Sequence, residues 1–201
     1  MRYLGIFIGA IVLVTGIYVA GVYLNLYGEL EEPGASVDSE LPKELVQSKL
    51  KAQEPFGKTK QILFGDTHVH TTYSTDAFFW SLPIMNGEGP HPISDACDFA
   101  RFCANLDFWV STDHAEALTP RKWKSIKEAV RSCNEPTDAQ EPDLVTFLGY
   151  EWTQVGTDAE SHYGHKNVMF LDIDEDKTPK RAIGAGGVAT NGMRNTLPGQ
   201  A

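Results

Sequence analysis

Six side chains of this sequence have the types and spacing that divalent metal binding requires. Each lies next to a short apolar segment, and four of the six are histidines. The six are His68, His70, Asp76, His114, Glu151 and His165. Imidazole together with carboxylate suits zinc, manganese or iron, whereas calcium and magnesium prefer ligands made of oxygen alone. The residue types therefore predict a site for transition-metal ions.

The spacing of these residues strengthens the prediction. His68 and His70 form a His-x-His motif, and in an extended segment this places both imidazoles on one face. Each motif is weak alone: strand-end histidines are common, Asp113 before His114 could cap a helix, and Glu151 could be a buried, hydrogen-bonded carboxylate. His68 and His70, then His114, then Glu151 follow three successive apolar segments, and His165 precedes the fourth. The carboxyl ends of parallel strands are where α/β proteins bind ligands.

The elements that must position these side chains alternate along the chain. Apolar runs predict strands over 61–66, 107–112, 144–150 and 167–171. Helical spacing predicts helices over 93–105 and 119–133, the second capped by Thr119 with Pro120 at its first position. Strands that alternate with helices indicate βαβ units and a parallel sheet. About four strands are too few for a closed barrel of about eight.

The segments HVHTTYSTDA, STDH, GYE and GHKN resemble the PHP (polymerase and histidinol phosphatase) superfamily, in particular its DUF3604 branch. The resemblance runs from about Ile62 to Leu171. It implies an α/β fold, a distorted (β/α)₇ barrel of which this chain holds a half-barrel. It also implies two or three divalent metal ions, zinc, manganese or iron, that hydrolyse phosphoesters with a metal-activated hydroxide.

The resemblance also implies how the ligands are divided. His68 and His70 would bind a first metal together with Glu151. Glu151 would bridge to a second metal bound by His165, which matches the family position better than His162. We expect His162 to face the substrate instead.

A third metal would be bound by Asp76 and His114. Asp66 and Asp113 fit supporting roles, in which they fix the tautomers of the imidazole ligands. We assign the catalytic roles to Glu151 and Asp113. Two ions that share a carboxylate can activate water at neutral pH, so no separate nucleophile is required.

Two other functions remain open. Amidohydrolase-type barrels also place His-x-His after their first strand. The Asp six residues after His70 favours the interpretation as a PHP-type hydrolase over this alternative. The other alternative is a metal-binding fragment without turnover. The family supplies further ligands late in its barrel, but no histidine follows His165 and residues 172–201 are polar and Gly-rich. We therefore expect an N-terminal fragment whose site is incomplete.

The first segment of the chain has a different character. No residue from Tyr3 to Gly28 is charged, and this run exceeds the roughly 20 apolar residues that a helix needs to span a bilayer. We predict a transmembrane signal anchor over residues 1–28. Cleavage after Gly21, with Val19 three positions before the cut, is the alternative.

Charge places the rest of the chain outside the inner membrane. Arg2 precedes the apolar run and acidic residues follow it at 29–32, which by the positive-inside rule predicts a periplasmic domain. Residues 29–60 are polar, contain three prolines and show at most one amphipathic turn, so we interpret them as a linker. The metallohydrolase domain is expected over 61–201.

Charge, cysteines and one long loop complete the sequence predictions. The net charge of −10, without a basic run, argues against nucleic acid as a partner, and a small ester or phosphoester is the expected substrate.

Of three cysteines, Cys103 and Cys133 are our choice for a disulfide in an oxidising compartment, and three buried thiols are the alternative. The aromatic segment 77–92 is expected to form a lid or to pack over the site.

Overall fold

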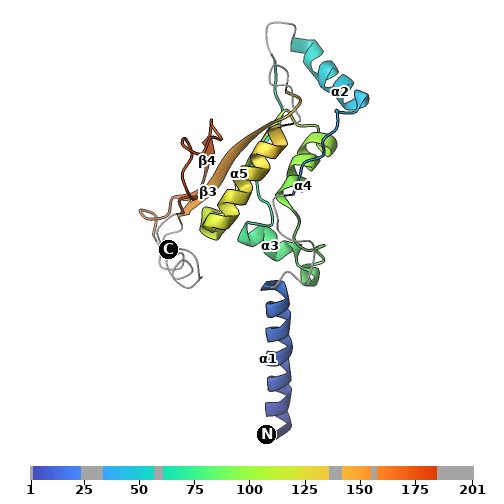
Figure 1. Cartoon of the computed structure of the whole chain (residues 1–201). Helices are drawn as coiled ribbons and strands as arrows, with labels where there is room; N and C mark the ends of the chain where they lie inside the picture. Colours follow the sequence, from blue (N-terminus) through green and yellow to red (C-terminus); the bar gives the residue numbers. More distant parts are fainter. Residues whose placement is uncertain (1, 24–33, 57–60, 136–141, 155–157, 185–201) are drawn as a thin grey trace.

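The computed structural model describes residues 2–23, 34–56, 61–135, 142–154 and 158–184 (Figure 1). Its centre is one sheet of four strands in the order β1-β2-β3-β4. The strands are β1 Gly65–Val69, β2 Phe108–Ser111, β3 Val145–Gln154 and β4 Gly164–Phe170. The sheet curls as a half-barrel, so the expected mixed α/β class and half-barrel shape are confirmed.

The helices of the chain differ greatly in length. They are α1 Arg2–Tyr23, α2 Lys43–Gln53, η1 Glu54–Phe56, α3 Thr75–Ser81, η2 Pro83–Met85, α4 Ile93–Asp98, η3 Phe99–Cys103, η4 Ala115–Ala117 and α5 Pro120–Asn134. The predicted helix over 93–105 is α4 continued by the π-helical turn η3. The predicted cap of α5 is confirmed, because Thr119 Oγ1 accepts a hydrogen bond from the Lys122 amide at 3.2 Å.

The direction of the fourth strand differs from the prediction. Strands β1, β2 and β3 are parallel, but β4 pairs antiparallel with β3. Only residues 155–163 separate the two strands, and a parallel crossover needs a connection of about a dozen residues or more. The short connection therefore produces a hairpin, and the predicted all-parallel sheet is wrong at β4.

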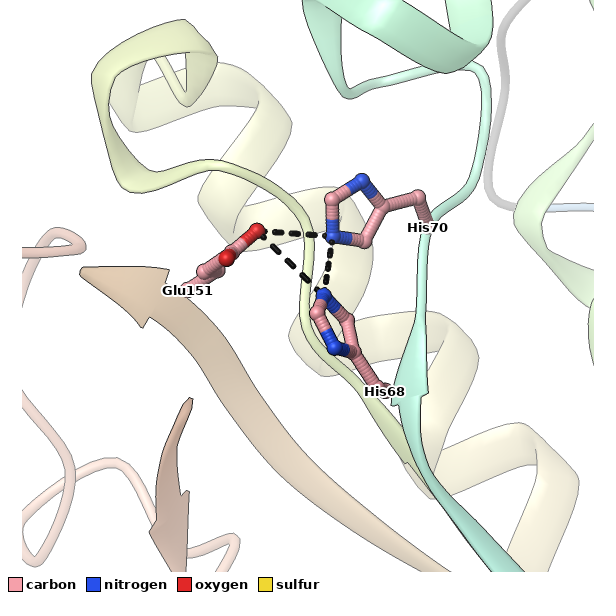
Figure 2. Close-up of side chains that lie close together, drawn as sticks. All are labelled: His68, His70 and Glu151. Atoms are coloured by element: carbon pink, nitrogen blue, oxygen red, sulfur yellow. Dashed lines mark hydrogen bonds and ion pairs between the residues drawn. The ribbon is translucent and has the colours of Figure 1, made fainter. Parts of the chain in front are cut away.

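The first strand begins later than predicted and is irregular. The sequence predicted a strand over 61–66, yet β1 covers Gly65–Val69 and its register on β2 shifts between Asp66 and Val69. At the irregularity, the Val69 amide donates to Thr112 Oγ1 at 2.8 Å instead of to a backbone carbonyl. Such a bulge changes the direction of side chains beyond it. Figure 2 shows this end of β1, from which His68 extends toward β3.

The convex face of the sheet is covered by α5, which lies along β3 in Figure 1. Trp123 and Val130 of α5 are buried against Leu148 and Tyr150 of β3. The Trp123 ring contacts Tyr150 and Phe170 edge-on, with centroids 5.9 and 6.3 Å apart. Each such buried side chain stabilises the fold by about 1.5–3 kcal/mol. This layer fixes β3 and β4 in place and leaves their other face for the polar side chains.

The segment before the sheet contributes one helix where the sequence indicated at most one turn. Helix α2 is 11 residues long and joins the amino-terminal end of the sheet through Lys49. Lys49 Nζ donates to the carbonyl oxygens of Leu106 and Asp143 at 2.7 and 2.6 Å. It also lies 3.2 Å from Asp107 Oδ1. Long-range hydrogen bonds therefore order α2, which local propensity alone did not predict.

The predicted transmembrane helix is not found. Within the described part of the chain, no helix has both the length and the apolar character needed to cross a membrane. The predicted span of 1–28 corresponds to α1, Arg2–Tyr23, whose apolar side chains from Tyr3 to Ile17 are exposed. Residues 24–28 of the predicted span lie outside the described residues.

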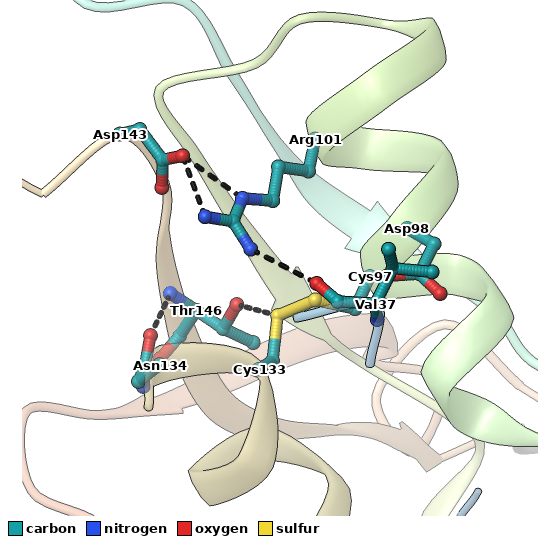
Figure 3. The surroundings of a disulfide bond; sticks show 8 residues. All are labelled: Val37, Cys97, Asp98, Arg101, Cys133, Asn134, Asp143 and Thr146. Carbon is teal, nitrogen blue, oxygen red and sulfur yellow. Dashed lines mark hydrogen bonds and ion pairs between the residues drawn. A yellow bond between two sulfur atoms is a disulfide. The ribbon is translucent and has the colours of Figure 1, made fainter. Parts of the chain in front are cut away.

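A disulfide joins α4 to α5, and its partners differ from the predicted pair. Cys97 bonds Cys133 with a Cα–Cα distance of 6.0 Å, while Cys103 is free and exposed (Figure 3). The predicted Cys103–Cys133 pair is wrong because Cys97 points into the core beside Trp109, whereas Cys103 points to solvent. Beside the disulfide, the buried Arg101 side chain donates to Asp143 Oδ2 through Nε and Nη2, at 2.9 and 2.7 Å.

Removing the disulfide should destabilise the domain. In Cys97→Ser/Cys133→Ser we expect the free energy of unfolding to fall by about 3–4 kcal/mol, since the bond closes a long loop in the unfolded chain. Urea unfolding followed by circular dichroism measures this change. The control Cys103→Ser should unfold like the wild type, and reductant should lower wild-type stability to that of the double variant. Equal stability of wild type and double variant would contradict the pairing.

Candidate metal centre

All six predicted ligands lie together on the concave side of the sheet. His68 lies on β1 and His70 directly after it. Asp76 lies in the first turn of α3, and His114 lies in the segment after β2. Glu151 and His165 lie on the neighbouring strands β3 and β4. In the described residues they form three overlapping groups whose ligand atoms lie within 4.8 Å of one another. The groups are His68, His70 and Glu151; His70, Asp76 and His114; and His114, Glu151 and His165.

Glu151 is at the centre of the cluster. Its side chain is 1% exposed, and four imidazoles surround it. Its Oε2 lies 2.9 Å from His70 Nε2, 3.3 Å from His114 Nδ1 and 3.5 Å from His68 Nε2. Its Oε1 lies 2.5 Å from His165 Nδ1. Figure 2 shows the side chains of His68 and His70 converging on this carboxylate from β1.

These residues fit a metal ion by a criterion that does not depend on sequence. Among the described residues, neither carboxylate oxygen of Glu151 has a hydrogen-bond partner, although both are buried. A buried carboxylate without hydrogen bonds is costly unless a cation compensates it. His68 Nε2 and His70 Nε2 also face each other at 3.1 Å, an arrangement suited to two lone pairs directed at one ion. The donor set of nitrogen and oxygen suits zinc, manganese or iron.

Asp76 provides a second carboxylate at the side of the cluster. Its Oδ2 lies 3.1 Å from His70 Nδ1 and 3.5 Å from His114 Nε2. Burial opposes ionisation, but hydrogen bonds from the Ala77 amide, the Ser74 hydroxyl and the His70 ring lower the pKa of Asp76 to about 2. The carboxylate is therefore charged at neutral pH, as a metal ligand must be.

Thr153 joins two of the imidazoles and was missed in the sequence. Its Oγ1 lies 3.0 Å from His114 Nδ1 and 3.2 Å from His165 Nδ1. Thr153 is two residues after Glu151 in β3 and is the cross-strand partner of His165. The alternation of side chains along a strand places it on the face of Glu151, so the period that linked His68 to His70 was a usable signal here too.

The carboxylates expected to support the imidazoles contact other groups. Asp113 is fully buried and accepts hydrogen bonds from the Thr71 amide at 2.6 Å and from Thr71 Oγ1 at 2.9 Å. Burial raises the pKa of Asp113 to about 6, against the opposing effect of the Thr71 hydrogen bonds. Asp66 Oδ1 accepts from the His68 amide at 2.9 Å. Both carboxylates thus hold the backbone around His68 and His70.

The other histidines lie apart from the three groups. His91 packs beside α4, where its Nδ1 is 3.2 Å from Asp95 Oδ2. His162 is exposed in the turn before β4, and its expected contact with substrate stays a prediction. The aromatic segment 77–92 contains most of α3 and η2, with Phe79 and Trp80 exposed. Its expected role as a lid also stays a prediction.

Comparison with known proteins gives one partial match. A family model described as "Protein of unknown function (DUF3604)" matches residues 57–120. The matched segment contains His68, His70, Asp76 and His114 but ends before β3. The similarity to this family is confirmed for that segment alone. No curated protein and no solved structure matches the chain.

Asp113 should be needed to hold the chain after His70. In Asp113→Ala the buried Thr71 amide loses its acceptor, so we expect apo-protein stability to fall by about 2–3 kcal/mol. Asp113→Asn keeps one acceptor oxygen and should lose less. Urea unfolding of metal-free protein measures both, with the exposed Asp158→Ala as control. If Asp113→Ala unfolds like the control, the proposed support of this segment is refuted.

Proposed function

We propose that this chain carries part of the metal centre of a hydrolase of small esters, in particular phosphoesters. The observation that supports the proposal is Glu151: a buried carboxylate with no hydrogen bond, surrounded by four imidazole nitrogens within 3.5 Å. The proposed ions are two or three of zinc, manganese or iron. When bound there, such ions lower the pKa of water and polarise an ester oxygen.

The proposed metal ligands fall into two groups that differ in the exposure of their side chains. Glu151, His70 and His114 form the enclosed floor of the centre, with side chains 1%, 16% and 18% exposed. His68 and His165 form its open rim and are 54% and 52% exposed. A substrate would therefore approach between the two rim histidines, and the floor would hold the ligand geometry against solvent.

Water is the nucleophile that best fits the sequence. The chain contains no G-x-S-x-G elbow, no P-loop and no H-E-x-x-H helix. The Asp six residues after His70 lies in the cluster, and this position is what separates a PHP-type centre from the amidohydrolase alternative. We accordingly interpret the curled sheet as part of a PHP-type barrel, with the antiparallel β4 as its departure from regular β/α order.

We also propose that the domain works outside the cytoplasm. The Cys97–Cys133 bond is typical of oxidising compartments, since cytosolic thiols are kept reduced. The exposed apolar surface of α1 from Tyr3 to Ile17 is suited to recognition as an export segment. The two features are independent, and both favour a periplasmic or secreted domain.

Glu151 should be required for metal binding. We expect the wild type to bind two or three zinc or manganese ions per chain, and Glu151→Gln to lose at least one of them, because the substitution keeps the shape but removes the negative charge. Metal analysis after dialysis and calorimetric titration measure this. Glu128→Gln, at an exposed position on α5, is the matched control and should bind as the wild type does.

Activity separates the remaining functions. The wild type loaded with metal should hydrolyse a chromogenic phosphomonoester or phosphodiester, and Glu151→Gln should reduce the rate to background. Metal bound without turnover of any phosphoester, carboxyl ester or cyclic amide would support the non-catalytic alternative. Turnover of the amide alone would support the amidohydrolase alternative. A folded wild type that binds no metal would exclude all three.

Export can be tested with a reporter. Residues 1–60 fused to an enzyme that is active only outside the cytoplasm should give active reporter, and the same fusion without residues 2–23 should not, because the apolar segment is lost. Cell fractionation and the mass of the mature chain then show whether the segment is retained or cleaved. Equal reporter activity in both fusions would contradict the proposed location.

A further inference from the structure

One asparagine connects the two outer strands of the sheet. The strand order places β1 and β4 at opposite edges, with β2 and β3 between them. Nevertheless, Asn167 Nδ2 on β4 donates a hydrogen bond to the Thr67 carbonyl oxygen on β1 at 2.8 Å. The curl of the sheet brings the edges this close, and the side chain of Asn167 crosses its concave side.

The bulge in β1 explains why the Thr67 carbonyl is available. The pairing of β1 with β2 includes Gly65, Asp66 and Val69, and the register shift between Asp66 and Val69 leaves Thr67 and His68 out of it. A residue in a bulge loses its regular partner in the ladder. The Asn167 amide replaces that partner for Thr67.

Asn167 is also the neighbour of the central carboxylate. In the antiparallel pairing of β3 with β4, Asn167 is the direct partner of Glu151. Directly opposed residues place their side chains on the same face, with Cβ atoms about 4.5–5.5 Å apart. Thr67 in turn immediately precedes His68. The bond from Asn167 to Thr67 therefore spans the distance between Glu151 and the His68 backbone.

The second amide atom of Asn167 adds an independent observation. Its Oδ1 is buried and has no hydrogen-bond partner among the described residues. An unpaired buried acceptor is unfavourable. A side chain whose only role was to donate to the Thr67 carbonyl would not need this acceptor. The unpaired Oδ1 beside Glu151 is suited to accept a hydrogen bond from a water molecule bound in the metal-loaded centre.

We propose that Asn167 is a positioning residue of the metal centre, which clamps β1 to β4 and so sets the distance from His68 to Glu151. The predicted effect of Asn167 on metal binding rests on the proposed function. The clamp itself is a property of the metal-free chain. The His68 side chain is half-exposed and belongs to a bulge, so without the clamp it would sample a wider range of positions.

The test uses two variants of the full chain and one control. Asn167→Asp keeps the shape and an acceptor but cannot donate to the Thr67 carbonyl, and Asn167→Ala removes both functions. Lys166→Ala is the matched control, because its exposed ammonium group donates only to the nearby Tyr163 carbonyl among the contacts that the structure gives it. Hydrogen exchange of the segment 65–70 is measured in metal-free protein, and zinc affinity is measured by calorimetry.

Both Asn167 variants should increase exchange in 65–70 and weaken zinc binding about tenfold or more, in the range of residues that orient metal ligands. His68→Ala should weaken binding in the wild-type background but add little in the Asn167→Ala background, because the ligand is already misplaced there. A purely structural role would give additive losses instead.

The outcomes separate the two proposals. Unchanged exchange in 65–70 would overturn the clamp, whether or not the chain binds metal. Increased exchange with unchanged zinc affinity would overturn the positioning role. A wild type that binds no zinc would overturn both the metal function and the positioning role, while the exchange data would still report on the clamp. If Asn167→Ala does not fold, Asn167→Leu, which keeps the approximate size but cannot donate to the Thr67 carbonyl, takes its place in these comparisons.

Discussion

The buried carboxylate of Glu151 is the constraint on which the rest of this structure depends. A carboxylate removed from water must be compensated by hydrogen bonds or by a cation, and Glu151 has no hydrogen bonds within the described residues. Four imidazoles approach it instead: two lie on the strands β1 and β4, and two lie in the segments that follow β1 and β2. The fold must therefore hold all four imidazoles in place around this buried carboxylate.

Contacts on both sides of the sheet hold these imidazoles in place. On the convex side, α5 packs its apolar face on β3, and the disulfide ties α5 to α4. On the concave side, buried Asp113 holds the chain after His70 through Thr71. The apolar contacts are spread over many atoms and fix the sheet as a unit. The polar contacts act on single residues and set the positions of individual ligands, so the two kinds of contact are not interchangeable.

Local sequence was sufficient for the parts of the fold that local interactions determine. The cap at Thr119 and the apolar face of the following helix predicted α5, and the His-x-His spacing predicted that His68 and His70 face the same way. The direction of β4 depended on the length of one connection. The disulfide partner depended on which side of α4 faced the core, and the position of Cys103 near the end of the predicted helix did not show that Cys97 is the buried cysteine.

The residues missed in the sequence share one property: their role exists only across strands. Thr153 is an ordinary residue type for a strand, and Asn167 ends the GHKN segment, in which only His165 was assigned a role from the sequence. Their importance arises from the register of β3 on β4, which places Thr153 opposite His165 and Asn167 opposite Glu151. A bulge in a third strand then provides the carbonyl that Asn167 binds. Register and bulges are tertiary features, so the period of β3 could place Thr153 on the face of Glu151 but could not reveal the contacts that these residues make across strands.

Metal binding and folding must be linked in such a centre. The metal-free chain keeps the Glu151 carboxylate buried without a hydrogen bond from the described residues, and an ion that binds only the folded state stabilises that state more as the ion concentration rises. Part of the intrinsic binding energy therefore offsets the cost of burying the carboxylate, and only the remainder appears as affinity. The open rim at His68 and His165 is the side at which metal coordination can vary, because both side chains are about half exposed to solvent. The enclosed floor at His70 and His114 would then retain its geometry while ligands exchange at the rim, which is the division that hydrolysis at such a centre requires.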